Sequence, residues 1–283
     1  MTTSVLHHAP YHIRVDGQKI AYHTAGDPSN PPIVMVHGWL SHSRVWRRQM
    51  DCLQASHYCV AVDLLGFGDS DSPAGGDYSL DSQGQRVLAV ADALKLGRFA
   101  LMGHSMGGQI ALLMAGKLAP QRITHLINVA GVLTGALCWW PRIVTKNQMR
   151  LGMIAPFLVP PTAFIFRLPF ITSMAYSAWF YKMLPLKDWV EDRERTLQAG
   201  IITSGYPAVC AIQHTDVTPY LPNITAKTLV MLGRDDSVVP VREGGKAAMG
   251  ITGARIQWFE ECGHFPHFEQ PEIFNRAVVD FIT

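Results

Sequence analysis

The chain has 283 residues, of which 48% are apolar and only 16% charged, and its formal net charge is +2. This composition permits a sizeable hydrophobic core and leaves further apolar side chains on the protein surface. A net charge this small, without a cluster of Lys and Arg, argues against a nucleic-acid-binding protein.

The five cysteines are odd in number and widely spaced, and no C-x-x-C occurs. This pattern favours thiols kept reduced in a cytosol over a disulfide framework. The N-terminal stretch lacks the apolar core of a signal peptide, and no run of 18 apolar residues is free of charge and proline. We therefore expect a cytoplasmic protein without a membrane-spanning helix.

Taken in chain order, residues 11–26 alternate around Asp16-Gly17 and predict a β-hairpin. Short apolar runs and amphipathic stretches then follow one another along the chain. The strands expected after the hairpin lie at 31–38, at the start of 57–71, and at 98–104, 123–131, 227–233 and 254–259. The expected helices cover 43–54, 79–96, 106–119 and 271–282. This order predicts an α/β fold with a mostly parallel sheet of about eight strands and helices on both faces.

The regular alternation stops between about 134 and 220, where prolines divide an apolar sequence into short pieces. We expect this segment, 134–220, to form a helical cap on a core made of 1–133 and 221–283. Its first part, 134–186, contains no Asp or Glu. It does contain five cations, which are Arg142, Lys146, Arg150, Arg167 and Lys182.

The stretch GHSMG places Ser105 between Gly103 and Gly107, with a predicted strand before it and a predicted helix after it. A serine hydroxyl is a poor nucleophile unless a base, an orienting acid and oxyanion donors surround it. The two glycines permit a sharp strand-to-helix turn that presents the hydroxyl at the edge of the sheet. The backbone N–H of Met106 then lies at a helix N-terminus and can bind an oxyanion.

The base should follow the last strand, where His264 and His267 are the candidates. His264 is preferred because Gly263 frees the local backbone. The acid should follow the strand at 227–233, where Asp235 and Asp236 are both present. The chain order serine, aspartate, histidine is the one expected when a G-x-S-x-G turn begins the triad. No metal-ligand spacing is matched near His264, so we expect neither a metal nor a cofactor.

A second oxyanion donor should come from the loop after the strand at 31–38, which reads HGWL. The backbone N–H of Trp39 is the candidate, beside that of Met106. One base suffices for a triad, so His37 in the same loop is expected to be a structural, hydrogen-bonding histidine.

Four stretches, HGW, GHSMGG, GRDDSVVP and GHFPHFEQP, together resemble the α/β-hydrolase superfamily. More narrowly, the chain is similar to capped serine hydrolases of the esterase, lipase and meta-cleavage-product hydrolase type, over about 13–133 and 220–283. The resemblance implies the α/β-hydrolase fold and a triad of Ser105, Asp236 and His264. The family's acid motif, G-x-x-D-x-x-x-P, favours Asp236 over Asp235.

Three residues narrow the expected reaction. A serine at position 105, rather than aspartate, argues against haloalkane dehalogenases and epoxide hydrolases. Family members that hydrolyse carbon–carbon bonds often have asparagine before the serine and tryptophan after the histidine, where this chain has His104 and Phe265. We therefore expect hydrolysis of small-molecule carboxylic esters. Carbon–carbon hydrolysis and a non-catalytic ligand-binding role are the alternatives.

Aromatic residues of the predicted cap suggest an apolar acyl or aromatic group in the substrate. The candidates for substrate binding are Trp139, Trp140, Phe164, Trp179 and Phe265. The alternative is that most of these side chains simply pack the cap on the core. The basic, acid-free and apolar composition of the cap also suggests peripheral contact with an anionic membrane. The oligomeric state is not indicated by the sequence.

Overall fold

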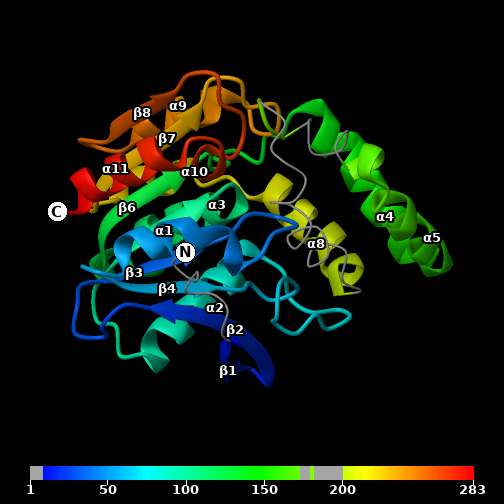
Figure 1. The fold of residues 1–283 in the computed structure, drawn as a ribbon, viewed down its shortest axis with the longest axis horizontal. Coiled ribbons are helices and arrows are strands. Elements are labelled where there is room, and N and C mark those ends of the chain that lie inside the picture. Colours follow the sequence, from blue (N-terminus) through cyan, green and yellow to red (C-terminus); the bar gives the residue numbers. More distant parts are fainter. Residues whose placement is uncertain (1–8, 173–178, 182–199) are drawn as a thin grey trace.

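The computed structural model describes residues 9–172, 179–181 and 200–283. The first eight residues of the N-terminal stretch examined for a signal peptide lie outside this range, as do 173–178 and 182–199 of the predicted cap. A sheet of eight strands runs through the centre in the order β1-β2-β4-β3-β5-β6-β7-β8 (Figure 1). The predicted α/β-hydrolase fold, with its mostly parallel sheet, is therefore confirmed.

The first two strands form the predicted hairpin. Strand β1 (Tyr11–Val15) pairs antiparallel with β2 (Gln18–Ala25), and the turn holds Asp16 and Gly17 at φ of 51° and 79°. Strand β2 is also antiparallel to β4 (Tyr58–Val62). The other pairings are parallel, and they join β4 to β3 (Pro32–Val36), β5 (Phe99–His104), β6 (Ile123–Val129), β7 (Lys227–Gly233) and β8 (Arg255–Phe259). Because parallel strands end at the same edge, the loops after them converge there.

Helices cover both faces of the sheet, so its strands are apolar on both sides. Alternate residues of β3 point into two separate cores, Ile33 and Met35 into one and Val34 and Val36 into the other. The first core includes side chains of α1 (Arg47–Leu53) and α11 (Pro271–Ile282). The second core includes side chains of α2 (Leu80–Ala93), α3 (Met106–Leu113) and α9 (Val241–Gly250).

Further helices lie beyond the carboxyl edge of the sheet. A π-helical turn (Trp140–Thr145) leads into α4 (Lys146–Ile154), and a 3-10 turn (Pro156–Leu158) leads into α5 (Val159–Phe166). Helix α8 (Gly200–His214) lies between these two outer helices and the sheet (Figure 1). Among the described residues, none of the helices combines the length and hydropathy that crossing a membrane requires.

Most predicted elements are present, and α8, α9 and the short helix α10 (Pro266–Glu269) are found in addition to the helices predicted individually. The helix expected at 43–54 begins as a 3-10 turn (Ser43–Trp46), and the helix expected at 106–119 ends in a π-helical turn (Met114–Leu118). Helix α9 was not predicted, since it contains Gly244-Gly245. Helix α8 was not predicted either, since Gly205 and Pro207 interrupt its helical pattern.

A buried glutamate fixes the point at which the chain leaves β6 for the outer helices. Glu243 of α9 is 1% exposed, and its Oε2 accepts hydrogen bonds from the backbone N–H groups of Leu133 (3.3 Å) and Thr134 (2.7 Å). The hydroxyl of Thr134 donates a third bond to the same oxygen at 2.8 Å. This carboxylate therefore satisfies three donors where regular backbone pairing has ended.

Replacing Glu243 by alanine should lower the free energy of unfolding by about 2–4 kcal/mol, because buried donors lose their acceptor. Glu260→Ala is the matched control, since Glu260 is 74% exposed and pairs with the exposed Arg234. The Glu260→Ala substitution should alter the free energy of unfolding by no more than about 0.5 kcal/mol. Urea denaturation of both variants checks this, and an equal loss in the two would contradict the anchoring role of Glu243.

Candidate active site

Ser105 lies at the turn between β5 and α3, in a backbone conformation that L-residues seldom adopt. Its φ is 56° and its ψ is −116°. Three backbone hydrogen bonds hold it there, from the Ser105 N–H to the Val129 carbonyl (2.9 Å) and from the N–H groups of Gln109 (3.0 Å) and Val132 (3.4 Å) to the Ser105 carbonyl. Residues kept in such a conformation by their surroundings are concentrated at functional sites.

The glycines on either side of Ser105 are required by close backbone packing. A Cβ on Gly103 would lie 2.2 Å from the carbonyl oxygen of Gly107. A Cβ on Gly107 would lie 2.3 Å from the carbonyl oxygen of Val36, at the end of β3. The G-x-S-x-G pattern is thus a steric condition for bringing α3 down onto the edge of the sheet.

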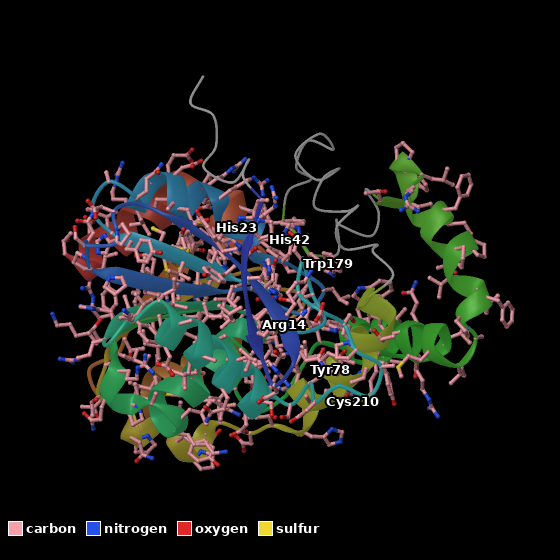
Figure 2. The ribbon with its side chains drawn as sticks, turned by 90° about the horizontal axis from the view of Figure 1, so that it is seen from below. Arg14, His23, His42, Tyr78, Trp179 and Cys210 are labelled. Carbon is pink, nitrogen blue, oxygen red and sulfur yellow. The ribbon has the colours of Figure 1, made fainter. Side chains whose placement is uncertain are left out.

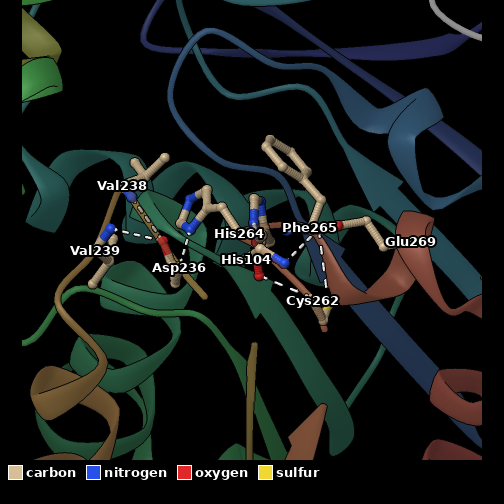
Figure 3. Close-up of polar contacts among 9 residues, drawn as sticks. His104, Asp236, Val238, Val239, Cys262, His264, Phe265 and Glu269 are labelled. Carbon is tan, nitrogen blue, oxygen red and sulfur yellow. Dashed lines mark hydrogen bonds and ion pairs between the residues drawn. The ribbon is translucent and has the colours of Figure 1, made fainter. Parts of the chain in front are cut away.

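His264 and Asp236 come from the loops after β8 and β7 and meet in a dry environment. The His264 Nδ1 and Asp236 Oδ2 atoms are 2.8 Å apart, and the two side chains are 4% and 3% exposed. The other carboxylate oxygen accepts from the backbone N–H groups of Val238 (2.8 Å) and Val239 (3.0 Å), as Figure 3 shows. Because a carboxylate only accepts, the proton lies on Nδ1 and Nε2 keeps its lone pair.

The two alternatives, Asp235 and His267, lie in different surroundings from Asp236 and His264. Asp235 is exposed, and its backbone N–H donates to the Cys262 carbonyl at 2.9 Å. His267 is fully buried and stacks on Trp46, with 4.7 Å between ring centroids. Of these residues, the structure therefore brings together His264 and Asp236.

The His264 loop is tied to the short described segment 179–181. The His264 N–H donates to the Trp179 carbonyl at 3.0 Å. Glu269 bridges the same two stretches, since its Oε1 accepts from the Gly263 N–H (2.9 Å) and its Oε2 from the Tyr181 N–H (2.8 Å). A movement of segment 179–181 would therefore act directly on the loop that carries His264.

His104, the residue before the nucleophile, is a buried neutral histidine. Its Nε2 donates to the His264 carbonyl at 2.9 Å, and its ring lies 4.7 Å from the His264 ring and 4.8 Å from the His267 ring. Burial, and secondarily the neighbouring histidines, hold the pKa of His104 well below its usual value. Burial does the same to the pKa of His267. These two rings therefore remain uncharged around His264.

His37 has the structural role expected from the sequence. Its Nδ1 donates to the Gly38 carbonyl at 2.7 Å, and its Nε2 accepts from the Leu64 N–H at 3.1 Å. Both ring nitrogens are thus engaged within the fold. Burial lowers the pKa of His37 to about 4, although the nearby Asp63 carboxylate opposes the shift, so the ring is neutral at neutral pH.

The two expected oxyanion donors flank Ser105. Met106 is the first residue of α3, where a helix leaves N–H groups without intrahelical acceptors. Trp39 follows Gly38, and a Cβ on Gly38 would lie 3.0 Å from the Ser105 Cβ, so this loop packs closely against Ser105. The Trp39 indole Nε1 donates to the Gly205 carbonyl of α8 at 2.8 Å, which anchors the loop from outside.

Two of the aromatic candidates for substrate binding lie at the His264 loop. The Phe265 ring is 4.6 Å from the His104 ring and 6.4 Å from the Trp179 ring, measured between centroids. Phe180 stacks on Phe265 at 4.9 Å. Together they form an apolar wall beside the histidine.

The other three candidates lie farther out. Trp139 is 67% exposed and Trp140 is half-buried. Both follow Cys138, whose backbone N–H donates to the carbonyl of Val238. Val238 lies in the loop after β7 that carries Asp236, which we call the acid loop. Phe164 is 67% exposed on α5, which stands well away from α3 (Figure 1). The structure therefore brings the two tryptophans near the acid loop and does not bring Phe164 to Ser105.

Sequence reasoning missed the residues of α8 that support the site. Besides the Gly205 carbonyl, the Ser204 hydroxyl donates to the Gly66 carbonyl at 2.6 Å. A Cβ on Gly66 would lie 2.3 Å from the Ser204 Cβ. Gly66 belongs to a loop that could be recognised in the sequence, whereas nothing local marks Ser204, because its partner is 138 residues away.

One group of side chains in the described part of the chain has metal-like spacing. His23, Asp63 and Asp69 each bring a ligand atom within 4.8 Å of the others. Both Asp63 oxygens are engaged by the backbone, with the Ser43 N–H at 2.6 Å and the Asp69 N–H at 3.0 Å. The Asp63 carboxylate therefore organises the loop after β4. His23, the third member of the group, is labelled in Figure 2.

The fold, the turn at Ser105 and the His264–Asp236 pair are those of a hydrolase. The chain belongs to the α/β-hydrolase fold family, whose model matches residues 31–271. It is 31% identical over 260 residues to a 2-hydroxy-6-oxononadienedioate/2-hydroxy-6-oxononatrienedioate hydrolase of Cupriavidus pinatubonensis. That match covers 88% of this chain and 86% of the relative.

Solved structures with this architecture include enzymes named for ester cleavage. A membrane phospholipase A, described as a bacterial virulence factor, superposes with a TM-score of 0.81 at 26% identity, over 97% of this chain and 85% of that one. An esterase from Exiguobacterium antarcticum superposes with a TM-score of 0.78 at 26% identity, over 94% and 96% of the two chains.

The buried neutral histidines make stability depend on pH in a defined direction. Below about pH 6.5 the unfolded chain binds protons at positions where the folded chain does not, so the free energy of unfolding falls as the pH falls. His104→Asn replaces one such group by a side chain that does not titrate. In this variant, the free energy of unfolding should fall less steeply below pH 6, by about 1.4 kcal/mol per pH unit.

Denaturant melts between pH 7 and pH 5 measure this slope. His12→Asn is the control, because His12 is exposed on β1, and its slope should equal that of the unsubstituted protein. Equal slopes for His104→Asn and the unsubstituted protein would show that His104 is charged in the folded state.

Proposed function

We propose that this α/β-hydrolase cleaves carboxylic esters through an acyl-enzyme on Ser105. The observation that carries the proposal is the His264–Asp236 hydrogen bond of 2.8 Å, in a site where both side chains are almost fully buried. His104 lies next to Ser105 in the chain, and its ring is 4.7 Å from the His264 ring, so the histidine loop lies over the nucleophile. Base, orienting acid and nucleophile thus come from three converging loops.

Each residue then has a defined task. Ser105 Oγ attacks the ester carbonyl while His264 Nε2 takes its proton and returns it to the leaving alcohol. Asp236 stays ionised and stabilises the imidazolium. The backbone N–H groups of Trp39 and Met106 bind the oxyanion of the tetrahedral intermediate. Water, activated by His264, releases the acid, so the proposed cycle needs no metal or cofactor.

The proposed substrate carries an apolar acyl or aromatic group. We propose that segment 134–220 forms a cap over the site, with Trp179 and Phe265 bordering the reacting carbon. Trp140 lies farther from His264 than these two side chains. Its buried indole N–H has no acceptor among the described residues, so we propose that it donates to a polar substituent of the substrate. The esterase and phospholipase neighbours are named for ester chemistry, which supports this substrate class.

Carbon–carbon hydrolysis is the second candidate, favoured by the name of the curated relative. The same triad can serve both reactions, so the discrimination must come from the pocket. His104 and Phe265 replace the asparagine and tryptophan that many carbon–carbon hydrolases have. His104 Nε2 donates to the His264 carbonyl at 2.9 Å, so the residue before Ser105 is tied to the histidine loop. We place ester hydrolysis first because of the apolar wall around Phe265.

A fluorophosphonate probe tests the nucleophile. The unsubstituted protein should be labelled at Ser105, with a mass increase of one phosphonyl group, because the probe reacts with serines activated by a base. Ser105→Ala should abolish the label, and Ser82→Ala, which removes a serine on α2, should leave it intact. A label that survives Ser105→Ala, or no label on the unsubstituted protein, would refute a serine hydrolase.

Substrate panels separate the two reactions. Among p-nitrophenyl esters from acetate to dodecanoate, kcat/KM should rise up to about fourfold for each added methylene until the apolar site is filled. A 2-hydroxy-6-oxo-dienoic acid should be turned over more slowly than the best ester. Faster turnover of that dienoic acid than of every ester would assign carbon–carbon hydrolysis to a working Ser105.

A further inference from the structure

The outer helices α4 and α5, with the turns beside them, expose large apolar side chains to an unusual degree. Ile154, Phe157 and Phe170 are 73%, 75% and 76% exposed, and Trp139 and Phe164 are each 67% exposed. Single exposed apolar residues are common, but this many in one stretch of the chain mark a surface that contacts something other than water. We call residues 139–172 the outer surface.

The charges on the outer surface all have one sign. Its sequence contains no Asp or Glu, and neither does the chain as far as residue 186. Arg142, Arg150 and Arg167 are exposed among the apolar side chains. Apolar side chains that insert at a bilayer boundary, flanked by Arg and Lys, are the combination by which peripheral proteins bind anionic lipid.

Among the described residues, the outward side of these helices is not covered by other parts of the chain. Helix α4 packs on α8 through Met149, whose Sδ would lie 3.0 Å from a Cβ placed on Gly205. Arg150, Leu151 and Ile154 of the same helix are exposed. Figure 1 shows α4 and α5 standing clear of the sheet, and Figure 2 shows side chains of these green helices pointing away from the body.

We propose that the outer surface docks on the headgroup region of an anionic phospholipid bilayer, with Phe157 and Phe170 inserted and Arg142 and Arg150 at the phosphates. A second copy of this chain is a poorer occupant, because pairing this surface with itself would place its cations against one another, and residues 139–172 contain no Asp or Glu to pair them. The docking is independent of the reaction at Ser105, so the inactive Ser105→Ala variant should bind equally well.

Vesicle flotation tests the proposal on the full chain. The unsubstituted protein should float with vesicles of phosphatidylglycerol and phosphatidylcholine, less with phosphatidylcholine alone, and less as salt is added. The double variant Phe157→Ser/Phe170→Ser should lose at least tenfold in partitioning to both kinds of vesicle. Arg142→Glu/Arg150→Glu should lose at least about 30-fold on the anionic vesicles alone.

The matched control is Met249→Ser/Lys246→Glu on α9, which removes an 82% exposed apolar side chain and an exposed cation from the body. It should float like the unsubstituted protein, and circular dichroism should show that every variant is folded. No flotation of the unsubstituted protein at low salt would overturn the proposal. The proposal would also be overturned if the Phe157→Ser/Phe170→Ser variant floated like the unsubstituted protein. A dimer in light scattering that the same variants dissociate, without flotation, would assign the surface to a second copy.

Discussion

The site depends on a steric constraint, the close passage of the β5–α3 turn over the end of β3. Gly103 and Gly107 permit this passage, since a Cβ on either would lie within 2.3 Å of a backbone oxygen. The turn forces Ser105 to a φ of 56° and places the first N–H groups of α3 beside its hydroxyl. Backbone packing therefore positions the proposed nucleophile and one proposed oxyanion donor together, before any side chain takes part.

A second constraint is the placement of charge in a dry site. His37, His104 and His267 surround the site as neutral rings, because burial opposes their protonation. His264 differs from them in having the Asp236 carboxylate as its partner, 2.8 Å away. A proton taken up during the proposed reaction would therefore be stabilised on His264 and not on its neighbours. Asp236 is itself held by two backbone N–H groups, so the acceptor does not move.

Much of this arrangement could be predicted from the sequence, because it is encoded locally. The strand, the two glycines and the helix around Ser105 are contiguous, and each loop after β7 and β8 carries its own motif. The α8 contacts could not be predicted, since Ser204 and Gly205 meet Gly66 and Trp39 across more than a hundred residues. The exposure of Phe164 on α5 could not be predicted for a related reason: composition shows that the segment is apolar, but not which way an apolar helix faces.

The account rests on Asp236 as the residue that orients His264, and adjacent Asp235 offers a matched comparison. The direct measurement is the second-order rate constant for phosphonylation of Ser105 at neutral pH in Asp236→Asn and in Asp235→Asn. Asp236→Asn should slow the reaction by about 10⁴-fold, because an amide partner favours the wrong tautomer of the histidine. Asp235→Asn should react like the unsubstituted protein. A normal rate in Asp236→Asn, or a loss confined to Asp235→Asn, would contradict the proposed triad.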